Sequence, residues 1–116
     1  MLQTFYILVM AHFVADFILQ GPVIAAKKRG LNKYMLIHGA VMAVAFFLPL
    51  INYPAGKTLL GALAVFVLHM TQDAIRVKVN GLLKVQPVSW PFYISLGIDQ
   101  ILHISVIYFL FSYFVI

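Results

Sequence analysis

The feature that most constrains this chain is a polar stripe within an otherwise apolar stretch. His12, Asp16 and Gln20 recur every fourth residue, and the residues between them are all apolar. On an α-helix, residues at this spacing lie on one face, one turn apart. A helix of this kind hides its polar face among other helices, so the stripe predicts a helical bundle with polar groups in its interior.

The same combination of residues returns twice. His69 and Asp73 repeat the four-residue spacing, and Asp99 and His103 repeat it in reverse order. Together with the first stripe, these segments contain all three acidic residues of the chain and three of its four histidines. The fourth histidine, His38, lies in another apolar run. A chain that places its few acids in apolar helices, each beside a histidine, is expected to form an internal site.

The surroundings of this site are expected to be lipid. The chain has 116 residues, of which 64% are hydrophobic and 9% charged, whereas about a quarter of the residues in soluble proteins are charged. This length corresponds to one transmembrane domain, residues 1–116. The expected fold is an all-α, membrane-embedded four-helix bundle of two helical hairpins, and the apolar runs predict helices at about 2–20, 34–51, 58–79 and 91–115.

The basic residues of the loops orient these spans. Lys57 is alone in the second loop, whereas the other seven basic residues lie in or near the first and third loops: Lys27, Lys28, Arg29, Lys33, Arg76, Lys78 and Lys84. Because lysine and arginine favour the cytoplasmic side, both termini are expected outside a bacterial inner membrane, in a multi-pass arrangement. Cations confined to loops are typical of membrane topology, and we expect no nucleic-acid partner.

With this topology, the order of histidine and aspartate along each helix predicts how deep each residue lies in the membrane. In the first and third helices, which run inward, histidine precedes aspartate; in the outward-running fourth helix, aspartate precedes histidine. The three aspartates should therefore lie near the cytoplasmic leaflet, with the histidines about 6 Å further out. Counted from Pro91, Asp99 would lie about 12 Å deep, which is deeper than expected for Asp73. Gly39 and Ala43 have the spacing that allows close helix contact.

The residue types predict a metal site. The chain has no cysteine, so imidazole and carboxylate would be the ligands, a set that suits zinc, manganese or iron. Gln20, Gln72 and Gln100 each lie near an acid and are expected to orient the ligands by hydrogen bonds. The candidate ligands are His12, Asp16, His38, His69, Asp73, Asp99 and His103.

These motifs also carry a family likeness. The patterns H-x3-D-x3-Q at 12–20, H-x3-D at 69–73 and D-Q-x2-H at 99–103 resemble those of a bacterial and phage family of small integral membrane proteins, catalogued as a domain of unknown function. The resemblance covers nearly the whole chain and implies a four-helix membrane protein without a defined activity. More loosely, a histidine-lined helical membrane protein looks like the membrane-bound metal-dependent hydrolases, although their tight histidine motifs are absent.

Several functions remain open at this point. One is a metal-dependent hydrolase that acts on a lipid-linked or phosphate-bearing substrate. Another is a proton- or ion-conducting, transport-associated subunit that uses the same cluster, and a third is a haem protein with histidine ligands. A fourth is a structural subunit of a larger membrane complex. In that case the His/Asp contacts, or a pair such as Asp73 with Arg76, would only hold the helices together. The lipid bilayer is the expected partner, and the sequence is also compatible with a homo-oligomer.

Overall fold

The first apolar span consists of α1 (Leu2–Phe13) and a π-helical segment, η1 (Val14–Leu19). The structure is a computed structural model, and it describes residues 2–19, 21, 32–86 and 88–116. Gln20, Lys27, Lys28 and Arg29 lie outside the described residues. The remaining elements are α3 (Lys33–Phe47) with the short 3₁₀ turn η2 (Leu48–Leu50), α4 (Ala55–Leu82), and α5 (Trp90–Phe109) with the π-helical segment η3 (Leu110–Val115).

Polar caps mark where two of these helices begin. The Asn32 side chain accepts a hydrogen bond from the Met35 backbone N–H at 3.0 Å, which caps α3. The Ser89 hydroxyl accepts from the Phe92 N–H at 3.4 Å, and Pro91 stands in the first turn of α5, where proline fits best. Short polar side chains therefore satisfy backbone donors at the ends of otherwise apolar helices.

Helix α4 is longer at both ends than the expected 58–79. Asn80 and Gly81 do not end it, because the Asn80 side chain donates to Ser95 Oγ on α5 at 3.1 Å and is thus tied to the neighbouring helix. The chain leaves the helical path only at Lys84, whose φ of 50° is left-handed. The longer α4 places Asp73 nine residues before its end at Leu82, and Asp99 lies nine residues after the start of α5 at Trp90.

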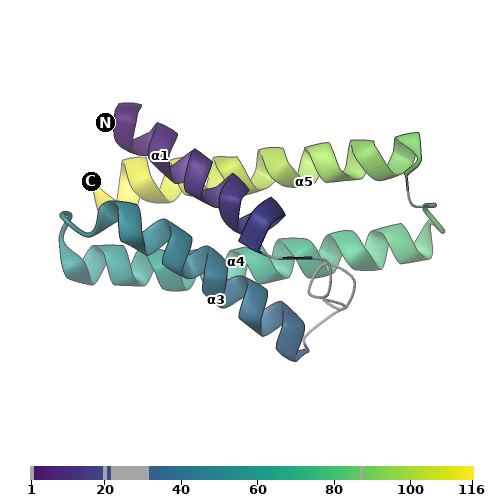
Figure 1. Cartoon of the computed structure of the whole chain (residues 1–116), viewed down its shortest axis with the longest axis horizontal. Helices are drawn as coiled ribbons and strands as arrows, with labels where there is room; N and C mark the ends of the chain where they lie inside the picture. Colours follow the sequence, from purple (N-terminus) through teal and green to yellow (C-terminus); the bar gives the residue numbers. More distant parts are fainter. Residues whose placement is uncertain (1, 20, 22–31, 87) are drawn as a thin grey trace.

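Four helical segments are long and apolar enough to cross a membrane: Leu2–Leu19, Lys33–Leu50, Ala55–Leu82 and Trp90–Val115. Figure 1 shows both termini at one end of the bundle, with α4 and α5 extending furthest toward the other end. Large apolar side chains cover the outside, among them Leu63, Val67 and Ile101. An apolar exterior on four spans is what a lipid environment requires, and the predicted all-α membrane four-helix fold is confirmed.

The interior is divided into an apolar half and a polar half. The apolar half lies nearer the termini, and its buried side chains include Leu8, Met42, Phe46, Val65, Ile107 and Phe111. The polar half follows it along each helix toward the opposite end and holds the histidines and aspartates.

A glycine brings α3 close to α4 at the polar half. A Cβ atom at Gly39 would lie 2.7 Å from Met70 Cγ and 3.2 Å from Phe66 Cδ2, both on α4. The close approach predicted from the small residue is therefore confirmed at this position. Gly39 follows His38 directly and Met70 follows His69, so this contact determines how near the two imidazoles come.

Candidate metal centre

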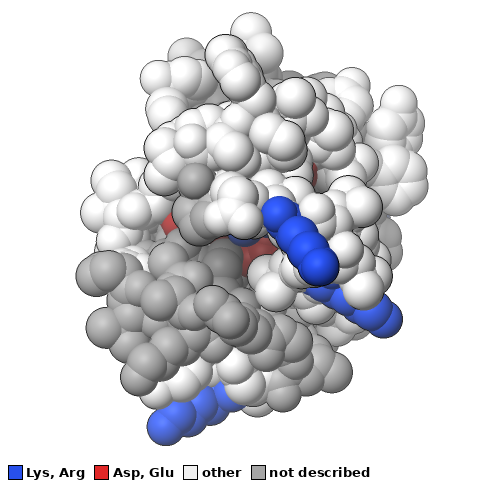
Figure 2. Space-filling model, turned by 90° about the vertical axis from the view of Figure 1, so that its right-hand side faces the viewer, with Lys and Arg blue, Asp and Glu red and all other residues white. Residues whose placement is uncertain are grey.

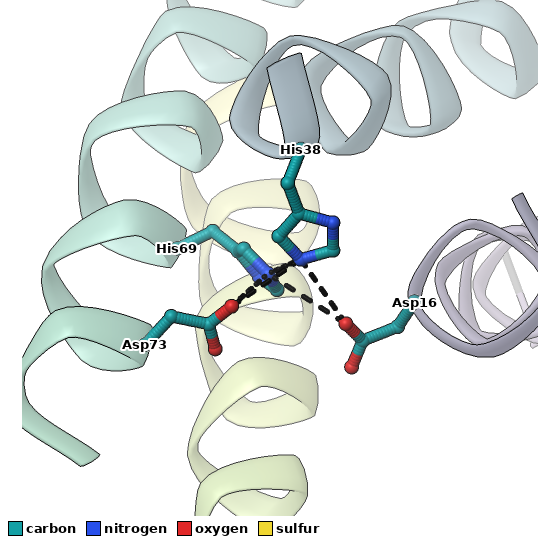
Figure 3. Close-up of side chains that lie close together, drawn as sticks. All are labelled: Asp16, His38, His69 and Asp73. Atoms are coloured by element: carbon teal, nitrogen blue, oxygen red, sulfur yellow. Dashed lines mark hydrogen bonds and ion pairs between the residues drawn. The ribbon is translucent and has the colours of Figure 1, made fainter. Parts of the chain in front are cut away.

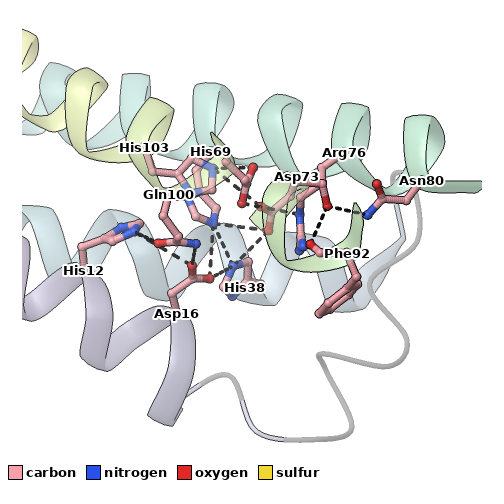
Figure 4. A network of polar contacts seen from close by, with 12 residues as sticks. His12, Asp16, His38, His69, Asp73, Arg76, Asn80, Phe92, Gln100 and His103 are labelled. Atoms are coloured by element: carbon pink, nitrogen blue, oxygen red, sulfur yellow. Dashed lines mark hydrogen bonds and ion pairs between the residues drawn. The ribbon is translucent and has the colours of Figure 1, made fainter. Parts of the chain in front are cut away.

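All seven predicted ligands lie inside the bundle, and none is more than 5% exposed. They come from the four spans and lie in overlapping groups of neighbouring ligand atoms; Figure 4 labels six of them, all except Asp99, close together. The depth mismatch expected for Asp99 is absent, because the extension of α4 to Leu82 puts Asp73 and Asp99 at equal distances from the helix ends. The three aspartates therefore share one region with the histidines, as the reversed motif order predicted.

Four side chains form the tightest part of this cluster, which we call the four-ligand group: Asp16, His38, His69 and Asp73. Figure 3 shows them pointing at one another from η1, α3 and α4. His38 Nε2 lies 2.8 Å from His69 Nε2, 3.2 Å from Asp16 Oδ1 and 3.3 Å from Asp73 Oδ2. His69 Nε2 lies 3.4 Å from the same Asp73 oxygen and 3.9 Å from the Asp16 oxygen.

Hydrogen bonds alone do not account for this packing. A neutral imidazole carries one N–H, yet His38 Nε2 has one nitrogen and two carboxylate oxygens within 3.3 Å. A tetrahedral ion with ligand bonds of about 2.0–2.2 Å has ligand atoms separated by about 3.3–3.6 Å. Five of the six separations among the four ligand atoms run from 2.8 to 3.9 Å and bracket that range, and the sixth is no more than 4.8 Å. The donor atoms are thus arranged as ligands around one small cation would be.

A second set, the three-ligand group, consists of Asp73, Asp99 and His103. His103 Nε2 lies 3.6 Å from Asp73 Oδ1 and 3.5 Å from Asp99 Oδ1. His103 is 2% exposed, and neither of its ring nitrogens has a hydrogen-bond partner among the described residues. A buried imidazole without a hydrogen bond is costly, and the Nε2 atom of this one lies close enough to two carboxylate oxygens for the three groups to hold an ion.

A glutamine amide links two of the predicted ligands. Gln100 Oε1 accepts a hydrogen bond from His12 Nε2 at 3.0 Å, and Gln100 Nε2 donates to Asp16 Oδ2 at 2.7 Å. The bridge leaves Asp16 Oδ1 directed at His38. His12, Asp16 and His103 also have ligand atoms close enough to share an ion. Gln100 thus hydrogen-bonds two of the candidate ligands, His12 and Asp16.

The other two glutamines were also expected to orient the ligands, but no such hydrogen bond is found among the described residues. Gln72 lines a cavity of about 10 Å³ together with His12, His69 and His103, which is room for about one water molecule. Its buried Oε1 has no hydrogen-bond partner among the described residues. Gln20, the third glutamine of the prediction, lies outside the described residues.

Arg76 also contacts the His/Asp cluster, although the sequence suggested only Asp73 as its partner. Its Nε lies 3.5 Å from Asp99 Oδ2, so a guanidinium on α4 faces a carboxylate on α5. The available sequence signal was its position on α4, three residues after Asp73 and thus on nearly the same helix face. The pairing with Asp99 depends on the register between the two helices and could not be inferred from one helix.

The end of the bundle opposite the termini is basic. Of the described lysines and arginines, only Lys57 belongs to the end with the termini, whereas Lys33, Arg76, Lys78 and Lys84 belong to the opposite half. Figure 2 looks onto that opposite end and shows acidic atoms in a recess, with lysine and arginine side chains nearby. The carboxylates are therefore nearest to solvent at the basic end.

Comparison with known proteins places the chain in a family. Searches among curated proteins and among solved structures found no match. Residues 4–116 match a family described as "Protein of unknown function (DUF3307)". This match agrees with the resemblance drawn from the His/Asp motifs, and it covers the four apolar spans except for the first two residues of the first one. Because it extends over nearly the whole chain, the protein belongs to the DUF3307 family.

Proposed function

We propose that this protein is a multi-pass protein of the bacterial inner membrane that binds a divalent metal ion, zinc, manganese or iron, in the four-ligand group. The observation that carries the proposal is the set of five ligand-atom separations between 2.8 and 3.9 Å, in a region at most 5% exposed. Buried carboxylates are costly unless a cation compensates them. A metal ion compensates two of them at once and accepts electron pairs from both imidazoles.

The metal lies in the cytoplasmic half of the membrane in this proposal. The polar half of the bundle is the half that carries Lys33, Arg76, Lys78 and Lys84. Basic residues favour the cytoplasmic side, so this end faces the cytoplasm and both termini lie outside. A substrate would then reach the carboxylates from the cytoplasmic leaflet, at the basic end of the bundle.

The activity that fits this position best is hydrolysis of a lipid-linked or phosphate-bearing substrate. A divalent cation held by Asp16, His38, His69 and Asp73 would supply Lewis-acid chemistry toward a phosphoryl group. The surrounding basic side chains attract an anionic head group, and the location within the membrane suits a substrate with a lipid tail. His12 and Gln100 keep the Asp16 carboxylate directed into the site.

Conduction of protons or ions has less support. The half of the interior nearer the termini is packed with apolar side chains, including Leu8, Phe46 and Phe111. The described polar groups in that half are few and separate, such as the Thr4–Tyr53 contact at 3.3 Å and buried Thr58. A purely structural role also fits poorly, because it leaves the buried His103 nitrogens without a hydrogen-bond partner among the described residues.

Elemental analysis tests the metal site. Protein purified in detergent without chelator should contain near-stoichiometric zinc, manganese or iron. Asp73→Asn should lose the metal, because the variant removes a charged ligand. Thr58→Val is the matched control, since Thr58 is equally buried on the same helix but outside the cluster. If the wild type has no metal and none of the three ions raises its melting temperature, the metal site is disproved.

Phosphate release tests the proposed reaction. Metal-loaded protein should release inorganic phosphate from a panel of lipid phosphates and diphosphates, and the Asp73→Asn variant should not. A protein that holds its metal but leaves the whole panel intact would contradict the hydrolase assignment and retain the metal-binding one.

A further inference from the structure

The two oxygens of the Asp73 carboxylate face different histidines. Oδ2 lies 3.3 Å from His38 Nε2 and 3.4 Å from His69 Nε2, within the four-ligand group. Oδ1 lies 3.6 Å from His103 Nε2, within the three-ligand group. In helical bundles that bind two metals, carboxylates from the helices are shared in this way between the two ions.

The groups around Asp73 Oδ1 are also arranged as a binding site. His103 is 2% exposed, neither of its ring nitrogens has a hydrogen-bond partner among the described residues, and its Nε2 is directed at two carboxylate oxygens. Its ring lies against the His69 ring, with centroids 4.0 Å apart, so the two imidazoles present their nitrogens to neighbouring positions. Arg76 contacts Asp99 through Oδ2, which leaves Asp99 Oδ1 for His103.

We propose that Asp73 bridges two divalent cations, one in the four-ligand group and a second in the three-ligand group. The proposal rests on the proposed metal-binding function and extends it from one ion to two. The second ion has three ligands among the described residues, Asp73, Asp99 and His103, and therefore coordination positions that none of the described ligand atoms fills. Those positions suit water or an anionic phosphate oxygen.

The charges of the cluster predict how the second ion binds. Three carboxylates and the Arg76 guanidinium sum to −2 with neutral imidazoles. One divalent cation brings this sum to zero, and a second raises it to +2 within a membrane interior. The second cation should therefore bind more weakly than the first, and an anion such as phosphate should strengthen its binding.

Manganese provides the test, because two Mn²⁺ ions that share a carboxylate give an exchange-coupled electron paramagnetic resonance spectrum. Chelator-stripped protein in detergent should bind two Mn²⁺ per chain at saturation, with the coupled spectrum. Inorganic phosphate should lower the Mn²⁺ concentration that fills the second position by tenfold or more. His103→Ala and the isosteric Asp99→Asn should each bind one Mn²⁺, with an uncoupled spectrum.

The outcomes separate this inference from the proposed function. One Mn²⁺ per wild-type chain at saturation, or two without exchange coupling, would overturn the bridging role of Asp73 while the four-ligand group still binds metal. No bound Mn²⁺, zinc or iron would instead overturn the proposed function itself. An unchanged second affinity in phosphate would refute the charge argument. Circular dichroism and gel filtration of both variants verify that they fold, and the wild-type stoichiometry needs no variant.

Discussion

His38 Nε2 of α3 and His69 Nε2 of α4 lie 2.8 Å apart across the interface between the two helices. The contact depends on the residue that follows each histidine. Gly39 leaves α3 without a side chain where Met70 of α4 packs, so the helix backbones approach closely. The distance between the two imidazoles is thus determined by a glycine that has no polar group of its own.

Gly39→Ala should weaken both the bundle and its metal site. The new Cβ would lie 2.7 Å from Met70 Cγ, so either the Met70 side chain or the helix must shift. We expect a loss of about 1–3 kcal/mol in the free energy of unfolding, and weaker metal binding. Thermal unfolding and metal titration in detergent measure the two effects. Gly97→Ala is the control, because a Cβ there has no neighbour within 4 Å; equal losses in the two variants would disprove the close-approach argument.

Gln100→Leu should lower metal affinity by about 10- to 100-fold, because the amide that links His12 to Asp16 is lost and the carboxylate can turn away. Gln3→Leu is the control, since Gln3 is an exposed glutamine of α1 outside the cluster. Competition with a metal-binding dye measures both affinities. A Gln100 variant with unaltered affinity would rule out the orienting role.

Arg76→Leu should destabilise the metal-free protein by about 3–5 kcal/mol, because it leaves the buried Asp99 carboxylate without its guanidinium. Lys78→Leu, two residues further along α4 and exposed, should change stability by no more than about 0.5 kcal/mol. Denaturation of chelator-treated protein compares the two. Similar stability for both variants would show that the Arg76–Asp99 contact contributes little.

Reporter fusions test the topology. A reporter placed after Lys84, between α4 and α5, should lie in the cytoplasm, and one placed after Ile116 should lie outside. The expectation follows from the basic residues at the end of the bundle opposite the termini. Two cytoplasmic readings would contradict the orientation and, with it, the assignment of the site to the cytoplasmic half.

Much of the candidate site was predictable from the sequence, for physical reasons that can be stated. Four apolar runs long enough to cross a membrane predict four helices, because a backbone in lipid must satisfy its own hydrogen bonds. The spacing of His12 and Asp16 places both on one helix face, and the reversed order of Asp99 and His103 brings them to the same level in an antiparallel helix.

The assignment of individual atoms was decided by the tertiary structure alone. Periodicity determines a residue's face and height on its own helix, but not the rotation, tilt and register of one helix against another. The π-helical segment Val14–Leu19 alters the register of Asp16 within its own helix. The packing of Gly39 against Met70 brings His38 to His69, and the register of α4 against α5 pairs Arg76 with Asp99. These contacts between helices place Asp73 in both groups of candidate ligands. They could not be predicted from the sequence, because the residue spacing within one helix does not determine how that helix packs against another.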